Sequence, residues 1–237
     1  MGLAKYIKEN ERFIVLEGIS THYANIEDTL DSSYAKFQLE RFNKAANMLK
    51  KKNNKLLAHT ACSAAVLLYK STHLDMIRVG IGLYGLWPSK ETQIALSLKK
   101  GNKIILRPVL SWKSRIAQVK TIDAGEPVGY GLTWYAPRRS KIGIIPQGYY
   151  DGYDRKLSNN SKVIVSGSEA PVIGRVAMNM IIVDLTNVAG AKTSDEVVLI
   201  GKYKGHEVSA DYLSERIGTI NYEVVTRINP NISRIII

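Results

Sequence analysis

The sequence is nearly free of cysteine: Cys62 is the single one among 237 residues. One thiol excludes an internal disulfide and suits a reducing compartment, so we expect a cytoplasmic protein. The sequence also lacks an apolar run near the roughly 20 residues that a membrane-spanning helix needs. Residues 1–8 carry charges but no apolar core or cleavage site, so neither a secretory signal nor membrane attachment is expected.

Two further classes of site have little support. The carboxylates of residues 146–155 have no partner histidine at ligand spacing, so no metal site is expected. The net charge is +12, from 33 basic and 21 acidic residues, and such a balance is compatible with a nucleic-acid partner. However, the lysines that cluster at 50–55 come without interleaved aromatics or a recognition-helix pattern. We interpret them as a solvated helix end and expect no nucleic-acid binding.

What the first part of the chain does contain is an alternation of helix and strand patterns. Helices are predicted over 3–10, 31–52 and 63–70, and strands over 13–19, 56–60 and 76–83. Strands separated by helices indicate βαβ units and a parallel sheet. A sheet of about three strands leaves its edges and one face uncovered. We therefore expect residues 1–96 to be the last part of a larger α/β unit.

After residue 96 the pattern changes to strands. Runs of β-branched residues that end at turns predict strands over 103–109, 111–122, 141–146, 162–165, 180–185 and 197–200. A short helix is expected over 209–217, where Ser209 or Asp211 can cap its first turn. Residues 97–237 are therefore predicted to form an all-β or β-rich domain.

Polar residues grouped around glycines are the candidates for a functional site. In the run Arg78-Val-Gly-Ile-Gly-Leu-Tyr-Gly85, an arginine precedes an open backbone that can approach an anion. His22 follows a predicted strand, at the position where catalytic groups of α/β barrels collect. Ser63 opens a predicted helix, so its hydroxyl and the free N–H groups there suit a phosphate. The plainer interpretations are a surface arginine beside a glycine turn, a structural histidine and an ordinary N-cap.

Tyr130 lies between Gly129 and Gly131, a spacing that would present its hydroxyl at the tip of a turn. A phenol serves as an acid or base only when its neighbours lower its usual pKa of about 10. Taken alone, the pattern favours a packing role for Tyr130. Two more polar segments around glycines follow, at residues 146–155 and 174–180.

Taken together, these segments resemble alanine racemase, a family of pyridoxal-phosphate enzymes. The resemblance runs in order along nearly the whole chain and rests on THYA at 21–24, HTACSAA at 59–65, RVGIGLYGL at 78–86, VGYGLTWYAP at 128–137, GYYDGYDR at 148–155, GRVAMNM at 174–180 and TINYEVVTRI at 219–228. It implies the end of a (β/α)8 barrel that binds pyridoxal 5′-phosphate, followed by a β-rich, barrel-like domain. It also implies a homodimer that converts L-alanine to D-alanine, a cell-wall precursor, by a two-base mechanism.

The resemblance also implies roles for residues that would bind the cofactor. Ser63 and the backbone N–H groups of Gly80 and Ile81 match ligands of the phosphate. Arg78 matches an arginine that bonds the pyridine nitrogen, and since arginine stays protonated it can only donate in that bond. His22 matches a histidine beside the cofactor ring, which links that arginine toward the catalytic tyrosine.

The remaining implied roles lie in the β-rich part. Tyr130 matches the base that takes the α-proton from L-alanine and that reaches the site of the other subunit. A positive arginine–histidine chain would help its phenolate to form. The backbone N–H of Met178 matches a ligand of the substrate carboxylate, and Tyr149 matches a tyrosine at the substrate entrance.

The sequence departs from the family pattern in several places. The family's second base is a lysine of the first barrel strand that also holds the cofactor, and neither it nor a substrate-steering arginine from that region has a counterpart here. Pro230 stands where some relatives have a phosphate-binding tyrosine, Asn179 replaces a common acid and Ala177 a common cysteine. We therefore expect the chain to begin past the middle of the barrel and to have little or no racemase activity alone. The alternatives are a racemase for another amino acid such as serine, or a non-catalytic or split-enzyme fragment that needs a complementary N-terminal partner.

Overall fold

The computed structural model describes residues 2–100 and 104–237, and it divides the chain into two compact units, Met1–Pro108 and Val109–Ile237. The sequence placed the boundary after residue 96, a point that lies within helix α4, Lys90–Lys100. Within the described ranges, none of the helices combines the length and the apolar composition that crossing a bilayer requires.

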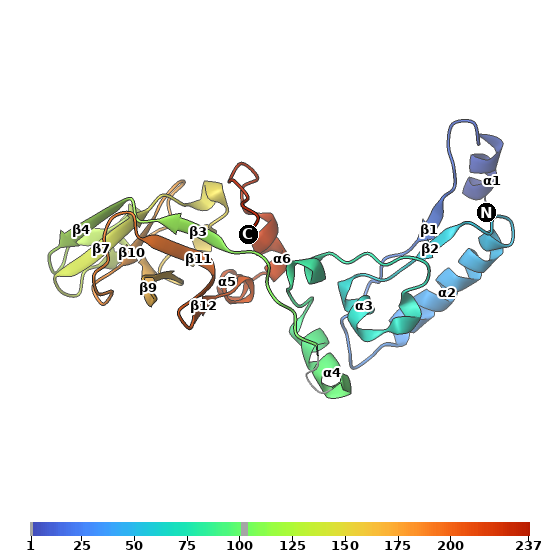
Figure 1. Cartoon of the computed structure of the whole chain (residues 1–237), viewed down its shortest axis with the longest axis horizontal. Helices are drawn as coiled ribbons and strands as arrows, with labels where there is room; N and C mark the ends of the chain where they lie inside the picture. Colours follow the sequence, from blue (N-terminus) through green and yellow to red (C-terminus); the bar gives the residue numbers. More distant parts are fainter. Residues whose placement is uncertain (1, 101–103) are drawn as a thin grey trace. The chain divides into compact units, whose positions relative to one another are not determined.

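The first unit has short strands and longer helices. Its elements are α1 (Gly2–Glu9), β1 (Gly18–Ser20), α2 (Ser33–Lys50), β2 (Leu57–His59), α3 (Ser63–Leu68), the 3-10 helices η1 (Lys70–Thr72) and η2 (Ile81–Tyr84), and α4 (Figure 1). Strands β1 and β2 pair in parallel, with Ser20 opposite His59. The predicted helices over 3–10, 31–52 and 63–70 are confirmed, and the parallel pairing agrees with the predicted α/β architecture.

Two strand predictions in this unit need correction. Of the strand predicted over 13–19, only the end is present as β1, and Phe13 and Val15 are 82% and 75% exposed. The strand predicted over 76–83 is wrong, because Ile81–Tyr84 forms the 3-10 helix η2. The backbone of Gly85 has a φ of 70°, and this left-handed conformation ends η2 in a tight turn that suits glycine.

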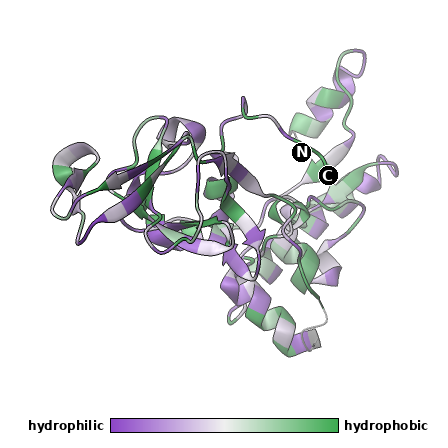
Figure 2. Cartoon of the chain, turned by 60° about the vertical axis from the view of Figure 1, so that its left-hand side comes forward, coloured by the Kyte–Doolittle hydropathy of each residue, from purple (hydrophilic) through white to green (hydrophobic). Residues whose placement is uncertain are grey.

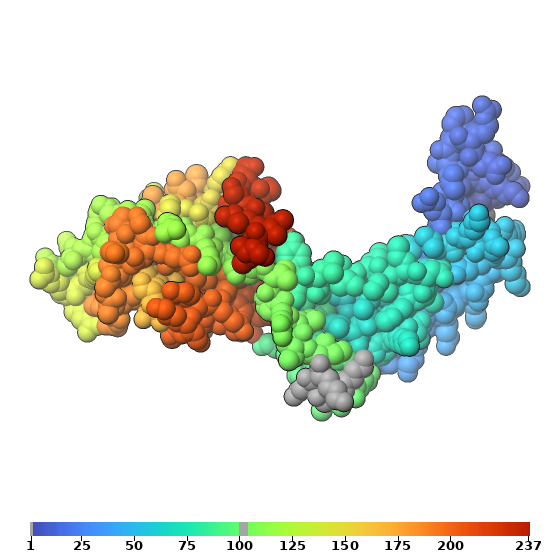
Figure 3. Space-filling model, in the orientation of Figure 1, coloured from blue at the N-terminus to red at the C-terminus, as the bar shows by residue number. Residues whose placement is uncertain are grey.

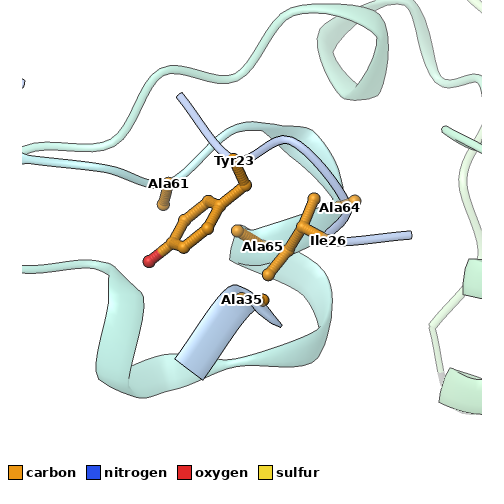
Figure 4. Packing of buried hydrophobic residues seen from close by; sticks show 6 residues of the cluster. All are labelled: Tyr23, Ile26, Ala35, Ala61, Ala64 and Ala65. Atoms are coloured by element: carbon orange, nitrogen blue, oxygen red, sulfur yellow. The ribbon is translucent and has the colours of Figure 1, made fainter. Parts of the chain in front are cut away.

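A small core joins the two strand ends of this unit. Tyr23, Ile26, Ala35, Ala61, Ala64 and Ala65 pack together, and the four alanines leave room for the Tyr23 ring (Figure 4). The Tyr23 hydroxyl donates a hydrogen bond of 3.0 Å to the Thr60 hydroxyl. Burial raises the pKa of Tyr23, so this hydroxyl stays protonated as a donor. The segment after β1 is thereby fixed to the segment after β2.

Residues before β1 contribute little to that core. Helix α1 has no buried residues, and Figure 3 shows the blue N-terminal segment as a projection from the rest of the first unit. Hydrophobic and hydrophilic residues are interleaved along α1, α2 and α4 (Figure 2).

The second unit is a curled antiparallel sheet. Its strands are β3 (Trp112–Arg115), β4 (Gln118–Ile122), β5 (Pro127–Val128), β6 (Trp134–Tyr135), β7 (Ser140–Ile145), β8 (Lys162–Val165), β9 (Ser168–Ile173), β10 (Ile181–Asp184), β11 (Glu196–Tyr203) and β12 (His206–Val208). The eight-stranded sheet has the order β12-β11-β8-β9-β10-β7-β4, and β3 also pairs with β11. Only Ile116 and Ala117 separate β3 from β4, so one continuous segment pairs with β11 and with β7. This connection curls the sheet.

Helices and tight turns complete the second unit. They are η3 (Tyr130–Leu132), η4 (Tyr149–Asp151), η5 (Arg155–Leu157), α5 (Ala210–Ile217) and α6 (Asn221–Thr226). The Ser209 hydroxyl caps α5 by accepting a hydrogen bond of 3.0 Å from the Tyr212 N–H, as the sequence allowed. Strands β8 and β11 run through the core, where Val163, Ile164 and Leu199 are fully buried.

The predicted β-rich domain is confirmed, with differences in detail. The strand predicted over 111–122 is two strands, because the chain changes partner at Ile116 and Ala117. The strand predicted over 103–109 is not formed by residues 104–109, and residue 103 lies outside the described residues. Strand β9, which the sequence did not predict, contains Pro171, a residue that weakens a strand pattern.

Candidate functional site

Arg78 is the centre of a hydrogen-bond cluster in the first unit. Its Nη1 lies 2.5 Å from Nδ1 of His59 and donates to the His59 carbonyl at 3.2 Å. Its Nη2 donates to the carbonyls of Thr21, at 2.9 Å, and Thr60, at 3.3 Å. Because an arginine can only donate, Nδ1 of His59 must accept, and the proton of a neutral His59 ring is on Nε2. Burial, and then the charge of Arg78, lower the pKa of His59, which favours this neutral form.

The strand ends explain why this cluster forms. Thr21 follows β1, His59 ends β2, and the Arg78 N–H donates to the Ala61 carbonyl at 2.9 Å. The cluster therefore lies at the carboxyl ends of two parallel strands, which is where ligands bind in α/β folds.

Ser63 and the glycine turn form a second cluster in the same unit. The Ser63 hydroxyl oxygen is buried and accepts hydrogen bonds from the N–H groups of Gly80, at 3.0 Å, and Gly82, at 3.2 Å. Two backbone N–H groups thus converge on the hydroxyl oxygen of Ser63. A phosphate takes this donor set in glycine-rich loops. These residues therefore fit a phosphate group.

Two other residues of the first unit, Ile81 and His22, are also predicted to bind the cofactor. Ile81 is buried at the start of η2, directly after Gly80. His22 is exposed, and its carbonyl accepts a hydrogen bond from the Gln38 side chain at 2.6 Å. His59, and not the His22 ring, contacts Arg78. The sequence offered a signal for His59, since it opens the motif HTACSAA, but only Ser63 was singled out there.

In the second unit, Tyr130 lies at the tip of the hairpin between β5 and β6. Its side chain is 72% exposed, as the flanking glycines predict. Gly129 and Gly131 have φ values of 77° and 72°, and Leu132 has a φ of 48°. Three of four consecutive residues are therefore in the left-handed region, where any residue other than glycine is strained.

This turn rests on the segment that follows β9. A Cβ placed on Gly174 would lie 2.7 Å from the Val128 carbonyl oxygen, and one on Gly131 would lie 3.0 Å from the Arg175 guanidinium carbon. Glycine at these positions permits the close approach of two backbones. Arg175 is a contact of the Tyr130 turn that the sequence reasoning missed.

Tyr149 and Met178 also lie close together. The Tyr149 N–H donates to the Ala177 carbonyl at 3.0 Å, and the Tyr150 N–H donates to the Met178 carbonyl at 2.8 Å. Gly148 makes this possible, since a Cβ there would lie 2.3 Å from the Ala177 oxygen. The side chains of Tyr149 and Met178 are both partly exposed. The second unit thus brings the turns of Tyr130, Tyr149 and Met178 onto one segment, residues 174–178.

An open cavity of about 520 Å³ adjoins Tyr149 and is lined by Tyr149, Gly152, Asp154, Arg155 and Arg227. Arg227 is neutralised in part by Asp154, at 3.1 Å, and by Glu223, at 2.7 Å. Over the described residues, no three metal-ligating side chains gather into a group.

Comparison with known proteins matches both units to the same family. Residues 1–88 match the family model for the N-terminal domain of alanine racemase, and residues 109–236 match that for its C-terminal domain. An alanine racemase of Leptospira interrogans (strain Fiocruz L1-130) is 43% identical over 225 residues, which are 94% of this chain and 58% of that protein. One of Halothermothrix orenii is 40% identical over 222 residues, 93% of this chain and 56% of that protein.

Solved structures give the same result. Alanine racemase from Bacillus anthracis with bound L-Ala-P is 32% identical, with a TM-score of 0.84 over 96% of this chain and 56% of that one. Alanine racemase from Bartonella henselae with covalently bound pyridoxal phosphate is 30% identical, with a TM-score of 0.75 over 98% of this chain and 60% of that one. The chain thus spans less than two thirds of the length of these relatives.

Proposed function

The chain belongs to the alanine racemase family, and we propose that it supplies the cofactor-binding and tyrosine-bearing parts of an enzyme that converts L-alanine to D-alanine. One observation carries this proposal: the hydroxyl of Ser63 and the N–H groups of Gly80 and Gly82 meet in the same unit as Arg78. We call this group the phosphate cradle. We also propose that the enzyme is a cytoplasmic homodimer, in which Tyr130 serves the site of the other subunit.

Pyridoxal 5′-phosphate is the cofactor that we propose, and when bound it withdraws electrons and makes the α-proton of an amino acid acidic. Ser63 and the N–H groups of Gly80 and Ile81 would hold its phosphate. The hydrogen bonds of the described residues use both terminal nitrogens of Arg78 and leave its Nε–H as the remaining donor. Arg78 would therefore donate a hydrogen bond from its Nε–H to the pyridine nitrogen. His59 and two carbonyls would hold the arginine side chain in place.

Tyr130 is the base that we propose for L-alanine, with its phenolate oxygen taking the α-proton. Its exposure leaves the hydroxyl free for a substrate. The N–H of Met178 would bind the substrate carboxylate, and Tyr149 would line the entrance. The lysine of the family pattern has no counterpart in the sequence, so we expect the 237 residues alone to give little or no turnover.

The function is tested by joining the chain to the lysine-bearing segment of the Leptospira relative and following L-alanine by chiral chromatography. We expect alanine to be racemised, and serine to be turned over far more slowly. Replacement of Tyr130→Phe should lower the rate from L-alanine by roughly 100-fold or more, the usual contribution of a positioned general base.

The matched control is Tyr135→Phe, which alters an exposed tyrosine of the same hairpin and should leave the rate unchanged. A Tyr130→Phe enzyme as fast as the parent would remove Tyr130 as the base. A joined protein that prefers serine would favour the second candidate substrate.

A further inference from the structure

The hairpin that carries Tyr130 has little support from strand pairing. Strands β5 and β6 have two residues each and form a two-stranded sheet of their own, separate from the eight-stranded one. Two-stranded hairpins are marginally stable in water. The left-handed residues Gly129, Gly131 and Leu132 add a conformational cost. Contacts outside the hairpin must therefore hold the turn in one conformation.

One side chain joins the two segments that meet at this turn. The Asn159 Oδ1 atom accepts a hydrogen bond from the Gly174 N–H at 2.6 Å. Its Nδ2 atom donates to the Thr133 Oγ1 atom at 3.1 Å, and lies 3.4 Å from the Thr133 carbonyl oxygen. Thr133 directly follows η3, and Gly174 lies under the turn against Val128. The Asn159 amide thus ties the exit of the Tyr130 turn to the backbone on which the turn rests.

Asn159 is itself held by its neighbours. Its φ of 53° is in the left-handed region, which asparagine adopts more readily than most residues. Ser158 accepts a hydrogen bond from the Val176 N–H at 2.9 Å, which adds a second tie to the 174–178 segment. Asn160 donates to the Arg216 carbonyl in α5 at 2.9 Å. The corner of residues 158–160 is therefore anchored on one side to a helix and on the other to the site.

We propose that Asn159 is a positioning residue, which sets the place of the Tyr130 hydroxyl by clamping Thr133 to Gly174. The proposal rests on the proposed role of Tyr130 as a base. A base contributes fully only when it is held at the reacting proton, and a misplacement of about 1 Å can cost roughly 100-fold in rate. Asn159 touches neither substrate nor cofactor in this scheme, so its effect on the reaction passes entirely through the turn.

The first test uses the 237-residue chain and needs no activity. Hydrogen exchange of the peptide covering residues 128–135 is followed by mass spectrometry in the parent, Asn159→Ala and Asn160→Ala. We expect Asn159→Ala to exchange roughly tenfold faster or more in this peptide, because the hydrogen bonds to Gly174 and Thr133 are lost. Asn160→Ala, whose bond goes to α5, should accelerate exchange in this peptide far less than Asn159→Ala does. Equal exchange in the parent and Asn159→Ala overturns the proposal.

Two variants protect the test against a general loss of structure. Thr133→Val removes the hydroxyl acceptor at the other end of the clamp and should accelerate exchange in the same peptide, by less than Asn159→Ala does. Asn159→Asp keeps an acceptor for the Gly174 N–H and should restore part of the protection. Faster exchange in Thr133→Val with unchanged exchange in β8 and β11 supports the clamp. If Thr133→Val and Asn159→Ala both leave the 128–135 peptide as slow as in the parent, the clamp does not exist.

The second test separates the clamp from the function. In the joined, active protein, Asn159→Ala should lower kcat for L-alanine by roughly 10- to 100-fold with little change in KM, because only the base is displaced. An altered KM with an unchanged kcat would contradict a positioning role. If the joined protein does not racemise alanine in any form while exchange responds as expected, the proposed function fails and the clamp stands.

Discussion

The two units build their parts of the site in different ways. In the first unit, the terminal nitrogens of Arg78 and the hydroxyl of Ser63 are engaged with neighbouring backbone groups. In the second unit, Tyr130, Tyr149 and Met178 are partly or largely exposed and stand on turns that glycines bring together. The first arrangement is a cluster held by hydrogen bonds to the backbone, whereas the second is a set of side chains presented outward.

The two units also differ in the size of their hydrophobic cores. The first has a two-stranded parallel sheet and a core that is mostly alanine, and it exposes large apolar side chains such as Phe13 and Leu30. The second has an eight-stranded sheet with many fully buried aliphatic residues. Buried apolar area is the main source of folding free energy. The hydrogen-bonded cluster is thus carried by the unit with the smaller core, and the exposed turns are carried by the unit with the larger one.

The largest effect is expected from Leu199→Ala in the core of the second unit. Leu199 is fully buried in β11, so the substitution should lower the free energy of unfolding by about 2–5 kcal/mol. Leu3→Ala removes the same atoms from α1 in the first unit, where Leu3 is 74% exposed, and should change it by less than about 0.5 kcal/mol. Urea unfolding measures both. Similar losses in the two variants would break the contrast between the units.

A smaller effect should come from Gly174→Ala, which probes the contact beneath the Tyr130 turn. Gly174 has a φ of 69°, and a Cβ there would lie 2.7 Å from the Val128 oxygen. Gly190→Ala is the control, since Gly190 has a φ of 71° and open space around it. Both should pay about 1–2 kcal/mol for the left-handed backbone, but Gly174→Ala should lose about 1–3 kcal/mol more. Thermal unfolding of the two variants compares them, and equal losses would mean that the turn does not depend on this contact.

The smallest effect is a pH dependence confined to the first unit. Burial and Arg78 lower the folded-state pKa of His59 below its unfolded value of about 6.5. The folded state therefore binds fewer protons, and its stability is complete above pH of about 6.5 and falls as the pH drops from there through the folded-state pKa. Hydrogen exchange of peptides from the first unit between pH 7.5 and 5 should show this loss after correction for intrinsic rates. His59→Gln should remove it; persistence in that variant would assign it to another group.

Much of the fold follows from local pattern. Runs of β-branched residues predict β7, β8 and β10 nearly to the residue, and the spacing of apolar residues predicts α2. The pattern fails where tertiary contacts decide. The run over 111–122 reads as one strand, but it changes partner midway because it pairs with both β11 and β7. The run over 76–83 has the apolar composition of a strand, but its second half forms the glycine-flanked helix η2.

For the candidate site, the glycine-bearing motifs predict which segments are involved but not which residues contact one another. The turn tip at Tyr130 follows from Gly129 and Gly131. The contact of Arg78 with His59 joins the end of β2 to the loop before η2, and the tie from Asn159 to Gly174 and Thr133 depends on three loops. Such contacts arise from the folded topology, and no spacing along the sequence encodes them.

The central claim is that the first unit carries a preformed phosphate cradle, and calorimetric titration of the 237-residue chain tests it most directly. Pyridoxal 5′-phosphate is compared with pyridoxal, which lacks the phosphate, on the parent and on Ser63→Ala. The cradle predicts that the phosphate compound binds at least roughly tenfold more tightly, and that Ser63→Ala weakens it by roughly 10- to 100-fold, as expected for one hydrogen bond to a charged group. Equal binding of the two compounds, or no effect of Ser63→Ala, would contradict it.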